Sequence, residues 1–437
     1  MKNSGFNLYS KAKKVILGGN MLFSKKPEIT LPGNKWPSYF TKAKKIYVWD
    51  LNKRKYIDMM MYVGHNILGY SDKQIDETIS KYIKKGNLTS LNCPEEVFLA
   101  QKLIKLHPWS GMAKFTRSGG EANAVAIRIA RAATKKDHIA ICGYHGWHDW
   151  YLSVNLKGKN NLKNHLLPGL SPYGVPNTLK NQTHPFKYGD LKSFKKIIKK
   201  FKLAAVIMEV GRSNLPDKKF LMQIRKLTFQ KKIILIFDEC TSGFRRNLGG
   251  MHITQKVYPD ICMLGKALGN GYAINAIIGK KEIMNKAKSS FISSTFWSER
   301  IGFVAALKTL EIMQNCKSWT KITKYGNYLK QKLIFLSKKY NLPIEVTGIE
   351  SILTYNFKNK KNLYYKTYIS QEMLKKNYLV SNTFFLSIYH DYKIIDKFIK
   401  NLDTIFSNIK KIEIQKKNIK NYLDGAVCWS SFARLNN

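Results

Sequence analysis

The sequence predicts an α/β protein whose large domain is built around a mainly parallel central β-sheet. Between about residues 112 and 280, short apolar runs alternate with helical segments, and this alternation is typical of successive βαβ units. The chain has 437 residues, of which 44% are hydrophobic and 12% aromatic. It is therefore long enough to bury one large core together with a smaller domain, and a disordered chain is not expected.

The N-terminal part, residues 1–80, is expected to contribute an arm, a helix and a hairpin to the small domain. Residues 7–16 favour a helix, and an irregular arm containing Gly and Pro follows it. Two β-rich runs, residues 46–50 and 55–59, flank a polar tetrapeptide and predict the hairpin.

The middle part, residues 81–310, is expected to form the large domain. Its strands are predicted where the apolar runs lie, at residues 112–115, 139–142, 204–208, 233–237, 261–264 and 276–278. Its helices are predicted at residues 95–107, 121–133, 191–200, 218–230 and 299–313. Residues 144–188 are rich in Gly, Pro and Asn with little periodicity, and a loop that long inside a compact domain is usually functional, such as a lid.

The C-terminal part, residues 311–437, is expected to complete a small α+β domain drawn from both chain ends. A long helix is predicted at residues 319–340. A strand at 352–357 and helices at 364–376 and 393–412 follow.

The strong positive charge does not by itself indicate nucleic-acid binding. The chain carries 75 Lys and Arg against 28 Asp and Glu, a formal net charge of +47. These lysines are spread along the whole chain, and no RNP, zinc-finger or helix-turn-helix pattern accompanies them. A lysine bias of this kind more often reflects the base composition of a genome, so no nucleic-acid partner is expected.

Composition also bears on compartment and metal binding. No run of about 20 apolar residues predicts a membrane span, and the first residues lack the apolar segment of a signal peptide. Six cysteines are scattered without CxxC spacing, which argues against a zinc cluster and favours a reduced, cytoplasmic protein. We therefore expect no membrane partner and no metal.

One lysine and one acid each follow a predicted buried strand. Lys266 comes two residues after the run 261–264 and opens a Gly-rich loop, and Asp238 follows the run 233–237. A lysine amine can form a Schiff base with the aldehyde of pyridoxal phosphate, and a carboxylate can pair with its pyridinium nitrogen. Taken alone, Lys266 could simply snorkel at a sheet edge. An unpaired Asp238 would be costly to bury, and a pyridinium N–H would compensate it.

Three further segments supply groups that suit the same cofactor. Ser118, Gly119 and Gly120 lie between a strand and a helix, where backbone N–H groups and the helix dipole bind anions; a plain helix cap is the alternative. Tyr144 follows a strand end and could stack on a flat ring. The hydroxyl of Thr295 is a candidate phosphate ligand, although alone it belongs to an ordinary Ser/Thr loop.

Two histidines near Tyr144, His145 and His148, have the residue type of metal ligands. No third ligand is evident in the sequence around them. A structural or gating role is therefore favoured over a metal site.

Taken together in this order, these segments resemble class III aminotransferases of the fold-type I pyridoxal-phosphate-dependent superfamily, in particular members similar to glutamate-1-semialdehyde 2,1-aminomutase. The likeness covers roughly residues 8 to 412. The residues that carry it are Ser118-Gly119-Gly120-Glu121-Ala122-Asn123, Tyr144-His145-Gly146, Asp238-Glu239 with Gly243-Phe244-Arg245, and Pro259-Asp260 through Gly265-Lys266.

The resemblance implies a role for each candidate residue toward pyridoxal 5'-phosphate. Lys266 is expected to hold the aldehyde as a Schiff base and to act as the catalytic residue. The remaining expected cofactor contacts are Asp238 on the ring nitrogen, Tyr144 on the ring face, and Ser118, Gly119 and Gly120 on the phosphate.

The resemblance also implies a homodimer with shared active sites. Thr295 would reach the phosphate of the cofactor in the neighbouring subunit. Glu209 and His145 would not touch the cofactor but would contact and orient the residues that do.

The departures from the family pattern concern mainly the substrate pocket. In the aminomutase an arginine of the N-terminal arm grips the substrate carboxylate, whereas the matching residues 18–26 contain no arginine, and lysine does not replace its bidentate fork. Gly120 stands where Thr or Ser is common, and Val210 where proline is preferred.

Three functions follow as alternatives. The first is a transaminase between an amino-acid donor and an aldehyde or keto acceptor, such as a surface-polysaccharide precursor. The second is the aminomutase itself, which forms 5-aminolevulinate. The third is a non-enzymatic basic binding protein on the same fold.

Overall fold

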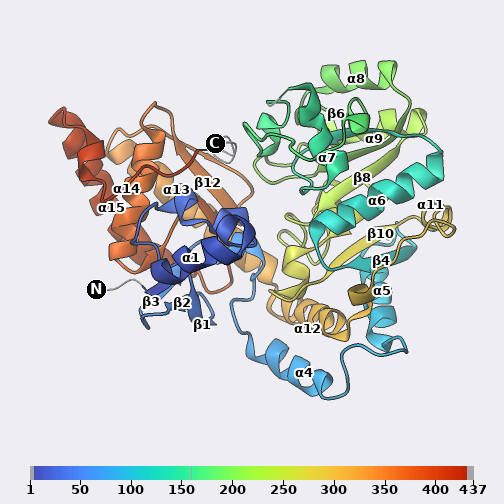
Figure 1. The fold of residues 1–437 in the computed structure, drawn as a ribbon, viewed down its shortest axis with the longest axis horizontal. Coiled ribbons are helices and arrows are strands. Elements are labelled where there is room, and N and C mark those ends of the chain that lie inside the picture. Colours follow the sequence, from blue (N-terminus) through green and yellow to red (C-terminus); the bar gives the residue numbers. More distant parts are fainter. Residues whose placement is uncertain (1–3, 159, 431–437) are drawn as a thin grey trace. The chain divides into compact units, whose positions relative to one another are not determined.

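The computed structural model describes residues 4–158 and 160–430, which divide into two compact units (Figure 1). The smaller unit combines residues 4–72 with Lys321–Ser430, and the larger unit is Lys73–Thr320. The sequence pattern placed these boundaries after residues 80 and 310. They lie after residues 72 and 320 because helix α4 (Lys73–Ile83) packs on helix α12 (Arg300–Cys316) within the larger unit.

The smaller unit contains two β-sheets covered by helices. Its four-stranded sheet has the order β1-β2-β3-β13, and its three-stranded sheet has the order β11-β12-β14. The strands are β1 (Phe40–Lys44), β2 (Tyr47–Asp50), β3 (Lys55–Asp58), β11 (Ile344–Thr347), β12 (Ile352–Phe357), β13 (Tyr378–Leu379) and β14 (Thr383–Phe385). The helices are α1 (Ser4–Val15), α2 (Pro27–Thr30), α3 (Met61–Gly64), α13 (Ser318–Lys339, which begins in the larger unit), α14 (Asn362–Lys375) and α15 (Tyr392–Ile414).

The predicted hairpin is present in this unit. Strands β2 and β3 pair antiparallel, with Val48 opposite Tyr56, across the polar tetrapeptide. Strand β13 then adds to β3 in parallel, so that residues near the two chain ends share one sheet.

The larger unit is built on a seven-stranded sheet with the order β4-β10-β9-β8-β7-β5-β6. Strands β6, β5, β7, β8 and β9 pair in parallel, whereas β10 runs antiparallel to both of its neighbours. The bounds are β4 (Met112–Thr116), β5 (His138–Cys142), β6 (Thr183–Pro185), β7 (Leu203–Glu209), β8 (Ile234–Glu239), β9 (Ile261–Leu264) and β10 (Asn275–Gly279). The predicted α/β class with a mainly parallel central sheet is confirmed.

Helices flank this sheet, and α6 contacts five of its strands from β4 to β7 (Figure 1). Helices α8 and α9 have the predicted bounds. The remaining bounds are α5 (Pro94–Leu106), α6 (Gly119–Thr134), α7 (Asp149–Leu152), α8 (Leu191–Lys200), α9 (Lys218–Gln230), α10 (His252–Gln255) and α11 (Lys281–Asn285). Within the described residues, no helix combines the length and the apolar character that a membrane crossing requires.

The segment 144–188 differs from the irregular loop that the sequence suggests. It contains α7, β6 and three short 3-10 turns. Tyr151, Leu162 and Leu167 are buried in the core of the larger unit. Gly, Pro and Asn break the periodicity of this segment, but its apolar residues still anchor it to the sheet.

Buried neutral histidines make the fold sensitive to acid. His107 donates from Nδ1 to Leu103 O and accepts at Nε2 from Gly250 N, and His390 donates from Nε2 to Asp58 O. Burial lowers the pKa of both side chains from 6.5 to about 4. The unfolded chain therefore binds protons between these values while the folded chain does not.

We expect the free energy of unfolding to fall as the pH decreases from about 6.5 to about 4, because each such histidine removes up to ~1.4 kcal/mol per pH unit. Urea midpoints at pH 7.5 and pH 5 test this. The variant His107→Gln should be less stable at pH 7.5 but should lose less stability on acidification. An equal loss in the variant and the parent would contradict the assignment.

Candidate active site

The candidate site lies at the edge of the large sheet where the parallel strands end. Glu209 at the end of β7 is paired with Asp238 on β8, and Glu239 is paired with Leu264 at the end of β9. Side chains that follow adjacent parallel strands converge at their carboxyl ends. This convergence brings Asp238 and Lys266, which are 28 residues apart in the sequence (266 − 238), to the same edge.

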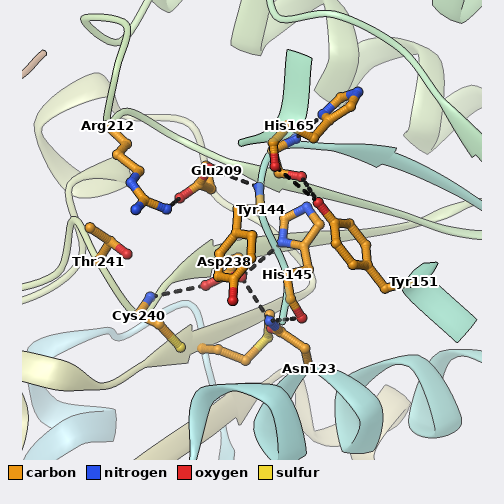
Figure 2. Close-up of polar contacts among 12 residues, drawn as sticks. Asn123, Tyr144, His145, Tyr151, His165, Glu209, Arg212, Asp238, Cys240 and Thr241 are labelled. Atoms are coloured by element: carbon orange, nitrogen blue, oxygen red, sulfur yellow. Dashed lines mark hydrogen bonds and ion pairs between the residues drawn. The ribbon is translucent and has the colours of Figure 1, made fainter. Parts of the chain in front are cut away.

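Asp238 is buried and held by three donors (Figure 2). Its Oδ2 accepts from Asn123 Nδ2 and His145 Nδ1, both at 2.8 Å, and its Oδ1 accepts from Cys240 N at 3.1 Å. Burial alone would raise the pKa of Asp238, but the hydrogen bonds and the interaction with His145 bring it below the usual value. A carboxylate can accept about four hydrogen bonds, so Asp238 is an ionised acceptor with capacity for one more donor.

Lys266 presents an amine whose basicity is strongly reduced. Burial lowers its pKa from 10.5 to about 7, and the positive charges of Arg212 and Arg245 add to the effect. Nζ donates to Thr241 Oγ1 at 2.7 Å. Near neutral pH a large fraction of this amine is unprotonated, and it can therefore attack an aldehyde.

The backbone around Lys266 is constrained. Lys266 has φ = +39°, in a region that residues other than glycine seldom adopt. A Cβ on Gly265 would lie 1.9 Å from Asn275 Oδ1, so only glycine fits there. Strained backbone of this kind is concentrated at functional sites, where the surrounding structure holds it in place.

The turn before α6 has the donors that a phosphate needs. Ser118 is the N-cap, and it forms a capping box with Glu121: Ser118 N donates to Glu121 Oε2 at 2.8 Å. Within the described residues, the amides of Gly119 and Gly120 make no hydrogen bond. Two unused N–H groups at the start of a 16-residue helix can bind an anion. The turn can therefore serve both purposes: Ser118 caps the helix, and the amides of Gly119 and Gly120 stay available for an anion.

Tyr144 lies between Glu209 and Asp238 in the close-up view (Figure 2). Its backbone N donates to Glu209 Oε2 at 3.1 Å, which fixes the residue just past the end of β5. The ring of Tyr151 meets the ring of Tyr144 edge-on, with the ring centroids 6.2 Å apart. These contacts hold an aromatic ring at the sheet edge beside the buried carboxylate.

Thr295 is exposed at the start of a short 3-10 turn, Thr295–Ser298. The structure does not bring it into contact with the other candidate residues of its own chain. Arg117 fixes this turn by donating from Nε to Phe296 O at 2.7 Å and from Nη2 to Trp297 O at 3.1 Å. The backbone of the turn is therefore fixed, while the side chain of Thr295 is exposed.

A buried cluster lies behind the site, where ligand atoms of Glu239, His252 and Cys262 come within 4.8 Å of one another. Hydrogen bonds join two of its members, Glu239 and His252. His252 Nδ1 donates to Glu239 Oε1 at 2.6 Å, and His252 Nε2 accepts from Trp109 Nε1 at 2.9 Å. Glu239 also accepts from Ser242 Oγ and from the amides of Met251 and His252.

Sequence reasoning missed several residues of the site. Asn123 belongs to the quoted turn motif, and its place one helical turn after Gly119 and Gly120 could have indicated that it faces the strand ends. Thr241 and Asn275 act through contacts that join distant segments. Arg212 follows β7 in a loop without periodicity. No sequence signal at these three positions distinguishes them from ordinary surface residues.

The fold and the site together define a pyridoxal-phosphate-dependent transferase, and comparison with known proteins gives the family. The family model for aminotransferase class-III matches residues 32–381. The chain belongs to the class III aminotransferases.

Two relatives illustrate the range of activities in the family. The chain is 33% identical to a 3-aminobutyryl-CoA aminotransferase of Cloacimonas acidaminovorans, covering 88% of this chain and 90% of that protein. It is 31% identical to a glutamate-1-semialdehyde 2,1-aminomutase of Wigglesworthia glossinidia brevipalpis, covering 94% and 99%.

Solved structures share the fold at lower identity. The FumI protein of Sphingopyxis sp. MTA144, in its PLP internal aldimine form, superposes with a TM-score of 0.85 at 23% identity, covering 96% of this chain and 99% of that one. An omega-transaminase from Sphaerobacter thermophilus gives a TM-score of 0.81 at 21% identity, covering 92% and 97%. The predicted fold type is confirmed, and the family implies pyridoxal phosphate as cofactor.

Proposed function

We propose that the chain is a pyridoxal-phosphate-dependent transaminase that moves an amino group between an amino-acid donor and an aldehyde or keto acceptor. The observation that carries the proposal is the pair formed by Lys266 and Asp238 at one sheet edge. Lys266 offers a half-buried amine with a pKa of about 7, and Asp238 offers a buried carboxylate that stays ionised. Membership of the class III family supports the same assignment.

The cofactor contacts follow from the donors and acceptors that the site leaves available. When the cofactor is bound, the amides of Gly119 and Gly120, with the Ser118 cap beside them, would hold the phosphate. Asp238 would accept from the ring nitrogen, and Tyr144 would lie against the ring. His145 orients Asp238 through Nδ1.

We further propose a homodimer in which Thr295 binds the phosphate in the partner's site. The support is that Thr295 is exposed and that Arg117 holds its turn firmly. Phe296 is 65% exposed in the same turn, an apolar surface of the kind that a second subunit covers.

The chemistry divides between the cofactor and the chain. When bound, pyridoxal phosphate supplies an aldehyde for covalent attachment to an amine and a ring that withdraws electrons from the substrate carbon. Lys266 Nζ takes a proton from the substrate carbon and returns one, for which a pKa near the working pH is best suited. Thr241 Oγ1 accepts from Lys266 Nζ and orients it. Glu209 fixes Tyr144 through its backbone amide.

The acceptor is the finer part of the proposal. Transfer between two molecules is supported by the relative named 3-aminobutyryl-CoA aminotransferase and by the absence of an arginine in residues 18–26. We propose a surface-polysaccharide precursor as the first acceptor class to test. The aminomutase activity is the second candidate, and the relatives of that name support it.

Borohydride trapping tests the cofactor assignment. The purified protein should be yellow, and reduction should bleach it while adding the cofactor mass to the peptide that contains Lys266. A protein without a chromophore after incubation with pyridoxal phosphate would point to the non-enzymatic basic protein instead. A label on another lysine would overturn the assignment of Lys266.

Incubation of the pyridoxamine form with glutamate-1-semialdehyde separates the two activities. We expect little 5-aminolevulinate unless a second substrate is present. Rapid formation of 5-aminolevulinate without any co-substrate would refute the transaminase proposal in favour of the aminomutase.

A further inference from the structure

A cavity of about 270 Å³ opens beside Tyr144 and Glu209. Complete small-molecule sites usually measure roughly 300–1,000 Å³, so this space suits one end of a substrate rather than a whole one. Arg212 and Lys187 line it along with Glu209, so its charged lining is two cations and one acid. The cavity favours an anionic group.

Arg212 is the residue of this cavity with the largest unused capacity for hydrogen bonds. A guanidinium has five N–H donors in a rigid fork. Within the described residues, the Arg212 guanidinium makes a single hydrogen bond, from Nη1 to Glu209 Oε1, at the long distance of 3.4 Å. The side chain is 19% exposed, so most of its donors are neither bonded to protein nor fully hydrated.

The position of Arg212 places its charge near the reacting amine. Its Cζ lies 5.7 Å from the centroid of the Tyr144 ring, and the guanidinium points toward Glu209 in Figure 2. Its charge also contributes to the lowered pKa of Lys266, whose Nζ contacts Thr241. A substrate whose nitrogen occupies the place of Lys266 Nζ therefore has a cation within reach of its far end.

Glu209 explains how this cation is held before substrate binds. Its Oε2 is occupied by Tyr144 N at 3.1 Å, so only Oε1 faces Arg212. A single long contact to one oxygen is weaker than the two parallel bonds that a guanidinium makes with a carboxylate. A substrate carboxylate can therefore engage Arg212 more fully than Glu209 does.

From these contacts we propose that Arg212 binds the carboxylate of the amino-acid donor, in place of the arginine missing from residues 18–26. The inference rests on the proposed transaminase function and adds the substrate group that the site recognises. Arg212 sets specificity by the fork geometry of its donors, which lysine cannot reproduce. Donors with a carboxylate are then favoured over amines that lack one.

Equilibrium binding to the holoenzyme tests this without turnover. The probes are propanoate, its neutral isostere propanamide and inorganic phosphate, titrated by calorimetry at fixed ionic strength. We expect Arg212→Gln to weaken propanoate binding about tenfold or more. The affinity of Arg212→Lys should lie between those of the parent and Arg212→Gln. Lys218→Gln, at the exposed start of α9 and outside the cavity lining, is the matched control and should change the affinity by less than about threefold.

A kinetic comparison supplies a second readout. In the first half-reaction, kcat/KM is measured for L-alanine and for ethylamine, which lacks the carboxylate. The ratio of the two values should fall about tenfold or more in Arg212→Gln. A general effect through Lys266 changes kcat/KM for both substrates by the same factor and therefore cancels in the ratio.

Three outcomes would overturn the inference. Equal weakening of propanoate and propanamide would show that Arg212 acts only through its neighbours, and unchanged binding would show that it is not a ligand. Phosphate binding that depends on Arg212 and exceeds propanoate binding would assign the cavity to a phosphate. A holoenzyme that binds propanoate through Arg212 but transfers no amino group would refute the transaminase function and leave the anion site standing.

Discussion

Replacing Lys266 with alanine is expected to remove covalent cofactor attachment and to lower kcat by at least about 1,000-fold. The side chain supplies both the amine that bonds the aldehyde and the group that moves the proton, and a positioned acid–base group alone contributes about 10²–10⁴-fold. Borohydride reduction followed by peptide mapping, together with single-turnover kinetics, measures the two losses separately. Lys266→Arg should be equally inactive, because it keeps a cation but no nucleophilic amine.

The matched control is Lys256→Ala. Lys256 is exposed at the C-cap of α10 with φ = +52°, close to the φ of +39° at Lys266, so both variants place alanine in the left-handed region. Backbone effects should therefore be similar in the two proteins. Retention of a borohydride-stable cofactor adduct in Lys266→Ala would show that another residue carries the cofactor.

The lowered pKa of Lys266 predicts how the rate of cofactor binding depends on pH. Below about pH 7 the amine becomes protonated and loses its nucleophilicity, so reconstitution of the apo-protein with pyridoxal phosphate should accelerate as the pH rises through about 7. Arg212 contributes to this lowering, and its replacement should move the midpoint upward. The midpoint therefore reports the charge environment of Lys266 independently of turnover.

The sequence allowed the fold to be predicted because the buried strands of a parallel sheet are continuous apolar runs. Strand β8 is buried along its whole length, and its run is unmistakable in the sequence. Strand β6 was missed, because Thr183–Pro185 is only three residues long and carries no apolar run. Strands β8 and β9 pair in parallel, so their carboxyl ends lie at the same edge of the sheet. Asp238 and Lys266 could therefore be placed at that edge from the predicted strand ends alone.

The polar contacts of the site could not be predicted in the same way. Asn123 reaches Asp238 across 115 positions of sequence, and Thr241 reaches Lys266 across 25. Such pairs depend on which faces of α6 and of the turn after β8 meet, and hydrophobic periodicity does not encode this. The capping box of Ser118 and Glu121 is the exception, because its spacing is local and readable.

Replacing Asp238 with asparagine is expected to lower kcat by about 100- to 5,000-fold while much of the fold is retained. Breaking a buried charge pair costs about 3–5 kcal/mol, and each 1.36 kcal/mol in the barrier is tenfold in rate. An asparagine amide would also face the N–H donors of Asn123 and His145, which need an acceptor. The first half-reaction, followed by cofactor absorbance, measures the loss.

Asp260→Asn is the matched control for this variant. Asp260 is also a buried aspartate of the same sheet, but it precedes β9, at the opposite end from Lys266, where it accepts from Arg225 Nη1 and Leu235 N, both at 2.9 Å. Its replacement should lower the unfolding temperature yet leave kcat within about threefold, because its charge does not face the site. Asp238→Glu keeps the charge one methylene further out and should recover part of the rate. Turnover of Asp238→Asn within tenfold of the parent would show that the carboxylate does not act on the cofactor ring.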